Sequence, residues 1–165
     1  MLLRRAFLAG SIAWAVAIPL AAFAASREGA ASAVYGFALS VYAIGRVVCH
    51  QLPVRSFHLW SVSLPVCARC AGIYGAAAVT SVVIALTPRP SAEARLVRRG
   101  AAREGGSAKA GGRLEPRLVL LAALAPTAAT LIFEWTTGVM PAGWIRALAG
   151  VPLGAAVAWA IGMVN

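Results

Sequence analysis

The sequence predicts an all-α, polytopic membrane helical bundle with about four transmembrane helices and a short interfacial or re-entrant helix. Hydrophobic residues make up 61% of the 165 residues, charged residues only 12%, and the mean hydropathy is +0.80. These values lie outside the range of soluble globular domains. A chain of this length has room for about four or five spans of roughly 20 residues, because the hydrocarbon core is about 30 Å thick. We therefore expect a single membrane domain over residues 1–165.

The first expected span covers residues 6–25, an apolar run without a charge that follows Arg4 and Arg5. The same N-terminal sequence also resembles a twin-arginine export signal, with a small-x-small cleavage site at residues 22–24. Cleavage of this segment therefore stays open. Both interpretations place the residues after Ser26 on the outer side of the membrane.

Three further spans are expected at residues 66–86, 118–135 and 144–164. Between the first two spans, residues 33–48 form an apolar stretch that contains aromatic residues and glycine. At about 16 residues it is shorter than a usual span, so the sequence predicts an interfacial or re-entrant helix there.

Residues 88–116 differ from the rest of the chain, because glycine, alanine and proline dominate and basic residues outnumber acidic ones. Such a segment cannot bury enough apolar area to fold alone, which predicts a disordered basic loop. Contact with anionic lipids is the alternative to a merely solvated linker. No aromatic residue lies in the loop to stack on bases, so we expect no nucleic acid among the partners.

The positive-inside rule places the basic loop in the cytoplasm, and Arg4 and Arg5 agree with that orientation. We therefore expect a multi-pass protein of the cell (inner or cytoplasmic) membrane with the N- and C-termini cytoplasmic. The loop between the first two spans and the turn at residues 136–143 then face outward.

All three cysteines of the chain fall in the outward-facing loop and the start of the span that follows it. Cys67 and Cys70 have Cys-x-x-Cys spacing, and Cys49 with His50 could complete a tetrahedral site for zinc or another soft divalent metal. Neighbouring side chains diverge by about 100° in a helix, so using both Cys49 and His50 as ligands requires non-helical backbone. His58 is a substitute ligand.

The same cysteines allow two other interpretations. Outside the cytoplasm, an odd cysteine beside a Cys-x-x-Cys pair permits a thiol-disulfide relay, and Arg69 would favour the thiolate form. Alternatively, Cys67 and Cys70 form a structural disulfide in a transport or scaffold protein. The metal-binding interpretation implies a metal-delivery protein as a partner, and the thiol-disulfide interpretation implies a redox protein. No motif identifies a reaction, so the sequence does not decide whether the protein is an enzyme.

A supporting set of polar residues is expected at the same outer edge of the bundle: Gln51, Arg55, Arg69, Glu134 and Arg146. Glu134 is the only acid inside an apolar run, and an ionised group at mid-span costs about 2.5 to 3.5 kcal/mol, less near an interface. We therefore expect Glu134 to pair with Arg146 or Arg69, the alternative being a carboxylate that reaches interfacial water.

Several of these motifs together resemble a family of small prokaryotic integral membrane proteins defined as a domain of unknown function. The resemblance rests on Cys-His-Gln-Leu-Pro at 49–53, Arg-Ser-Phe at 55–57, Pro-Val-Cys-Ala-Arg-Cys-Ala-Gly-Ile-Tyr-Gly at 65–75, Glu134, and Arg-x-x-x-Gly at 146–150. It covers roughly residues 42–154 without the basic loop.

What the resemblance implies is a membrane bundle with a Cys/His site, but no reaction. The chain departs from the family pattern at two positions. The family more often has aspartate where Glu134 stands, and usually asparagine where Gly143 stands. The second departure removes one polar side chain from the expected site.

Overall fold

The computed structural model describes residues 2–27, 29, 31–87 and 115–163. The expected disordered loop at residues 88–116 therefore lies almost entirely outside the described residues. The elements in chain order are α1 (Leu2–Ala25), α2 (Ser32–Val48), η1 (Pro53–Arg55), β1 (Ser56–Leu59), β2 (Val62–Cys67), α3 (Ala68–Leu86), α5 (Pro116–Thr137) and α6 (Gly143–Met163).

Four of the described helices, α1, α3, α5 and α6, are long and apolar enough to cross a membrane. They contain 24, 19, 22 and 21 residues, which at a rise of 1.5 Å per residue matches a hydrocarbon core of about 30 Å. The predicted fold class is therefore confirmed, and the chain is a multi-pass protein of the lipid bilayer. Large apolar side chains that remain exposed on these helices, such as Leu121 and Phe133, are suited to contact lipid.

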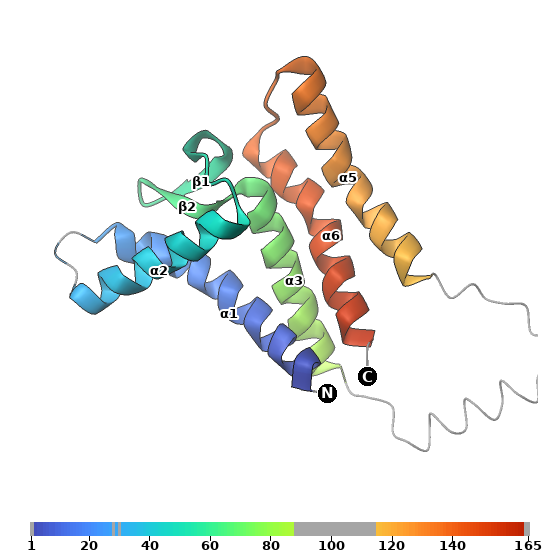
Figure 1. The fold of residues 1–165 in the computed structure, drawn as a ribbon, viewed down its shortest axis with the longest axis horizontal. Helices are drawn as coiled ribbons and strands as arrows, with labels where there is room; N and C mark the ends of the chain where they lie inside the picture. The colour runs from blue at the N-terminus through green and yellow to red at the C-terminus, as the bar shows by residue number, and fades with distance from the viewer. Residues whose placement is uncertain (1, 28, 30, 88–114, 164–165) are drawn as a thin grey trace, which may run out of the picture.

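The shorter apolar helix, α2, has 17 residues and lies across the upper part of α1 instead of joining α3 and α6 in the bundle (Figure 1). A shorter apolar helix is therefore present where the sequence predicts one, and its interfacial or re-entrant placement stays a prediction. Because α2 ends at Val48 beside β2, it delivers Cys49 to the end of the bundle where α3 begins.

The segment between α2 and α3 contains an antiparallel β-hairpin, where the sequence had predicted only a polar loop. Trp60 and Ser61 both have positive φ angles, 51° and 64°, and form the two-residue turn between Leu59 and Val62. Paired left-handed residues of this kind define a type I′ turn, which normally uses asparagine and glycine. The unusual turn residues explain why the hairpin was missed.

The hairpin also corrects the predicted start of the second span. We expected the span to run from residue 66, with Cys67 in its first turn. Val66 and Cys67 instead belong to β2, and α3 begins at Ala68 with Cys67 as its N-cap in extended backbone. Val66 is completely buried, which explains why its hydrophobicity did not distinguish a strand from a helix.

Helices α3 and α6 pack tightly side by side and run in the same direction, while α5 runs antiparallel to α6 (Figure 1). A side chain on Gly72 would overlap the backbone of Ala147, and one on Gly154 would overlap the backbone of Ile73. Small residues thus allow the backbones to approach closely, as in other membrane helix pairs.

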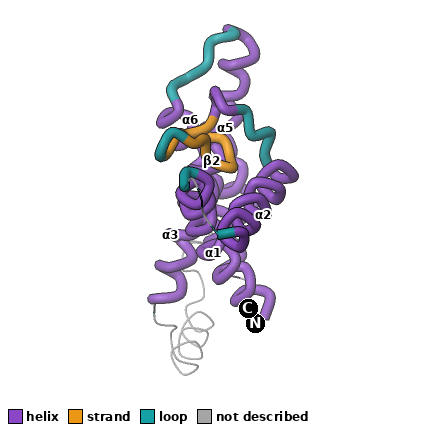
Figure 2. Tube along the Cα trace, turned by 90° about the vertical axis from the view of Figure 1, so that its left-hand side faces the viewer, coloured by secondary structure: helices purple, strands orange, loops and turns teal. Residues whose placement is uncertain are grey.

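Both termini of the described chain lie at one end of the bundle, and the hairpin and the connection between α5 and α6 lie toward the other (Figures 1 and 2). The N-terminal ends of α3 and α6 are therefore neighbours at the hairpin end. A small core of Ile18, Ala22, Cys49, Leu64 and Val66 joins α1, the end of α2 and β2 at this end.

Candidate functional site

The three cysteines, far apart in sequence at positions 49 and 67–70, meet in one cluster. Their Sγ atoms all lie within 4.8 Å of one another, and all three are free thiols. Cys49 is only 9% exposed, and the backbone N–H of Cys67 donates a hydrogen bond to its Sγ at 3.1 Å. The cluster is thus a compact group of soft ligand atoms at the end of α3.

Local backbone geometry brings the thiols together. Cys49 ends α2 in extended conformation, with φ −149° and ψ 143°, so the chain leaves the helix at this residue. The hairpin then reverses the chain, so that Cys67 at the end of β2 returns to Cys49. Cys70 follows in the first turn of α3, and residues three apart on a helix share a face.

The Gln51 side chain links α2 to β2 next to the thiols. Its Nε2 donates hydrogen bonds to the carbonyl oxygens of Tyr42 in α2, at 2.8 Å, and Pro65 in β2, at 2.6 Å. Gln51 itself has a positive φ angle of 46°, a conformation that non-glycine residues rarely adopt. The two hydrogen bonds of the Gln51 side chain offset this backbone strain, because they link α2 to the hairpin that carries Cys67.

Tyr42 and Gly45 also take part in the contact between α2 and β2, and the sequence does not identify them as parts of a site. The Tyr42 hydroxyl donates a hydrogen bond to the Ser63 carbonyl oxygen at 2.5 Å. A side chain on Gly45 would overlap the Pro65 carbonyl and the Gln51 amide, so this position has room only for glycine. Both residues read in the sequence as ordinary members of an apolar helix, and no local signal marks them.

The two histidines stand apart from the thiols. His50 is exposed and is not among the groups that lie within 4.8 Å of one another, and His58 is exposed on β1. The structure therefore brings together three of the four predicted ligands. A role for His50 as the fourth ligand stays a prediction, and it requires the His50 side chain or backbone to move toward the thiols.

The environment of Cys67 favours its thiolate. The pKa of the Cys67 thiol is lowered to about 5, chiefly because the Cys70 side chain hydrogen bonds to it. The backbone N–H of Cys70 and the Cys49 side chain act in the same direction, whereas burial opposes them. Metal ligation and thiol exchange both require the thiolate form.

The predicted partner of Glu134 is present in the structure. Oε1 of this carboxylate lies 3.0 Å from Nη2 of Arg69, and Oε2 lies 3.5 Å from Nη1 of Arg55. Nη2 of Arg69 also donates to the hydroxyl of Thr130 at 3.1 Å. Glu134 is only 7% exposed, so its charge is compensated by Arg69 and Arg55 instead of by bulk water.

Arg146, the other proposed partner of Glu134, does not pair with it. This residue lies in the first turn of α6 and is only 5% exposed. Within the described ranges, no carboxylate lies within 4.0 Å of its guanidinium group, and its Nε has no hydrogen-bond acceptor.

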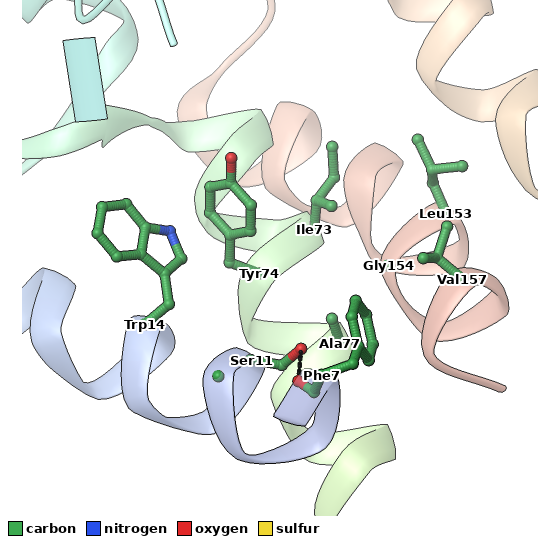
Figure 3. A pocket seen from close by; sticks show the side chains of 10 residues that line it. Phe7, Ser11, Trp14, Ile73, Tyr74, Ala77, Leu153, Gly154 and Val157 are labelled. Atoms are coloured by element: carbon green, nitrogen blue, oxygen red, sulfur yellow. Dashed lines mark hydrogen bonds between the residues drawn. The ribbon is translucent and has the colours of Figure 1, made fainter. Parts of the chain in front are cut away.

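An apolar cavity of about 440 Å³ lies between α1, α3 and α6. Figure 3 shows Phe7 and Trp14 of α1 near Tyr74 and Ala77 of α3, with Val157 of α6 on the far side. The Trp14 and Tyr74 rings meet edge to face at a centroid distance of 6.1 Å. Tyr74 also packs against the core cluster that contains Cys49, so the cavity begins next to the thiols.

Comparisons with known proteins place these residues in a family. A short segment is 40% identical over 45 residues to the uncharacterized protein MJ1492 of Methanocaldococcus jannaschii, which is 27% of this chain and 29% of that protein. No solved structure matches the chain. A family model described as "Predicted membrane protein" matches residues 49–160, a region that begins at Cys49 and includes Arg55, Glu134 and Arg146. The chain therefore belongs to the DUF2085 family of predicted membrane proteins.

Proposed function

We propose that this protein binds a soft metal ion, zinc or a similar divalent metal, through Cys49, Cys67 and Cys70. The observation that carries the proposal is the convergence of three free Sγ atoms within 4.8 Å of one another. Thiolates bind zinc at about 2.3 Å, which places two sulfur ligands of one tetrahedral ion about 3.8 Å apart. Only a small contraction of the cluster would be needed.

The occupant of the fourth coordination position decides whether the metal site is open or closed. A zinc site with three protein ligands keeps an open position, whereas a structural site uses four. If His50, the histidine nearest in sequence, is the fourth ligand, the site is closed. If the fourth ligand comes from outside the chain, the site stays open to exchange. A metal-delivery protein is the kind of partner that an exchangeable position would serve.

Elemental analysis of the full chain purified in detergent tests this proposal, with thiol counting on the same sample. We expect about one metal ion per chain, and loss of most of it in Cys49→Ser, Cys67→Ser and Cys70→Ser, because such sites tolerate a missing thiolate poorly. His50→Ala and His58→Ala, compared with each other and with the wild-type protein, decide whether one of these histidines closes the site. A wild-type protein that binds no metal when supplied with zinc under reducing conditions would exclude the proposal.

A thiol-disulfide redox protein is the second candidate. The adjacent free thiols of Cys67 and Cys70, together with the lowered pKa of Cys67, favour it. In that case the protein would hold little metal, and Cys70→Ser would trap a mixed disulfide visible on non-reducing gels. A redox partner protein would replace the metal-delivery protein. A metal-free protein that traps no mixed disulfide would leave a structural disulfide as the remaining interpretation.

We also propose that the cysteine cluster faces outward, with both termini in the cytoplasm. The distribution of basic residues supports this orientation, because basic residues favour the cytoplasmic side. A reporter fused after Gly106 should behave as cytoplasmic, and one inserted at the Trp60 turn as extracytoplasmic. The opposite result for the Gly106 fusion would place the thiols on the reducing side.

A further inference from the structure

Three arginines and one carboxylate with unbalanced charge lie in η1, at the start of α3, at the end of α5 and at the start of α6. Glu134 is shared by Arg69 and Arg55, and Arg146 has no acidic partner in the part of the chain that the structure describes. A cation that is nineteen-twentieths buried without a counter-charge is unfavourable, so it points to a ligand. We propose that Arg146, with Arg69 and Arg55, binds the phosphate group of an anionic ligand.

Helix packing places Arg146 and Arg69 at the same level. The Thr127 hydroxyl of α5 donates to the Ala149 carbonyl of α6 at 2.8 Å. Because α5 and α6 are antiparallel, moving about one turn along each toward the hairpin end brings Thr130 level with Arg146. Arg69 also reaches Thr130, at 3.1 Å. The Arg69 guanidinium group therefore contacts the turn of α5 that lies level with the buried Arg146 of α6.

The helix ends add to this positive potential. Arg69 lies in the first turn of α3 and Arg146 in the first turn of α6, and these helices run in the same direction. Side chains on helices lean toward the N-terminus, so both arginines lean toward the hairpin end. Backbone N–H groups and the positive end of the helix dipole favour an anion at this end. The Nε of Arg146, buried and without an acceptor, supplies a donor for it.

The position in the membrane favours phosphate over other anions. Arg69, Glu134 and Arg146 lie within a turn of the ends of three candidate spans. In a bilayer this position corresponds to the region where phospholipid headgroups meet the hydrocarbon core. Guanidinium groups recognise phosphate oxygens through paired hydrogen bonds. Glu134 belongs to the cluster but holds Arg69 and Arg55 in place, and the two remaining positive charges match a phosphate. A lipid headgroup and a soluble phosphate share this chemistry.

Two measurements on the full chain in detergent distinguish these sources. Native mass spectrometry should show one retained phospholipid on the wild-type protein if the ligand is a lipid. If the ligand is soluble, inorganic phosphate should raise the Tm of the delipidated protein by about 3 °C or more relative to chloride at equal ionic strength. In either case Arg146→Gln should abolish the effect, whereas Arg46→Gln, which removes an exposed charge on α2, should preserve it.

Arg146→Met tests whether Arg146 binds a ligand or only stabilises the fold. Without lipid or phosphate, this variant should be at least as stable as the wild-type protein, because it removes a buried charge that lacks a partner. With the ligand present, the wild-type protein should be the more stable of the two. Arg146→Lys should bind more weakly but measurably. A wild-type protein that neither retains phospholipid nor responds to phosphate would overturn the proposal, as would a loss of stability in Arg146→Met under every condition. Neither result depends on whether metal is bound.

Discussion

The thiol cluster and the arginine cluster lie at the same end of the bundle but are assembled in opposite ways. The thiols come from residues 49–70, and a hairpin, two helix ends and the Gln51 side chain bring them together. The arginine cluster, Arg55, Arg69 and Arg146 with Glu134, takes residues from η1, α3, α6 and α5, and it depends on how α3 and α5 each pack against α6. The thiol cluster therefore depends on local chain reversal, whereas the arginine cluster depends on the contacts that α6 makes with α3 and α5. Substitutions should therefore be able to disable one cluster and spare the other.

The largest effect should come from removing the one negative charge of the arginine cluster. Glu134→Gln leaves Arg69 and Arg55 without their carboxylate, and breaking a buried ion pair by removing one partner costs about 3 to 5 kcal/mol. We expect a strongly lowered Tm in detergent with little change in thiol reactivity or metal content.

Glu134→Asp is the matched control, since it keeps the negative charge and shortens the side chain by one methylene. It should retain most of the stability. An unchanged Tm in Glu134→Gln would show that water, and not Arg69, compensates the carboxylate. Loss of metal together with stability would show that the two clusters are not separable.

A smaller effect should follow from loosening the helix interface on which the arginine cluster depends. A methyl group on Gly154 would overlap the backbone of Ile73, and overpacking of this kind costs about 1 to 3 kcal/mol. Gly154→Ala should therefore lower the Tm and weaken phosphate binding while the three thiols remain clustered.

Gly75→Ala in α3 provides a control of opposite sign. Among the residues that the structure describes, nothing lies within 4 Å of a Cβ atom placed at Gly75, and replacing glycine by alanine inside a helix stabilises by about 0.5 to 1 kcal/mol. Equal losses of stability in the two variants would contradict the proposed role of the α3 and α6 contact.

The smallest effect concerns the protonation of Cys67 in reduced, metal-free protein. With its pKa lowered to about 5, Cys67 should react with iodoacetamide over a pH range where an ordinary thiol is protonated, with half-maximal reactivity near pH 5. Because the folded-state pKa lies below the unfolded value, this thiol contributes stability that is complete above the unfolded pKa of about 9. That contribution is lost as the pH falls from about 9 to about 5.

Peptide mapping by mass spectrometry assigns the reaction to Cys67 among the three thiols. Cys70→Ala should move the midpoint upward, toward that of an ordinary thiol, because the Cys70 side chain is the largest cause of the lowered pKa. Gln51→Ala should shift it less, since it acts only by loosening the contact between α2 and β2. A wild-type midpoint near pH 8 or 9 would contradict the assigned thiolate.

The sequence by itself determined the membrane bundle and its spans, because an apolar run of about 20 residues can satisfy its backbone in lipid only as a helix. It also determined which residue types carry chemistry, and it named Arg69 and Arg146 as candidate partners of Glu134 but not Arg55, which the structure adds. Those inferences use composition and spacing alone, which the chain carries whatever its tertiary contacts.

Only the tertiary structure decided how these residues meet. It chose Arg69 over Arg146 as a partner of Glu134, because the Arg69 side chain reaches from the start of α3 to Glu134 and Thr130 of α5. It formed a hairpin through Trp60 and Ser61, whose left-handed conformations no local sequence preference predicts. It also left His50 exposed and outside the group of three thiols. Each outcome depends on contacts between segments distant in sequence, which local patterns do not encode.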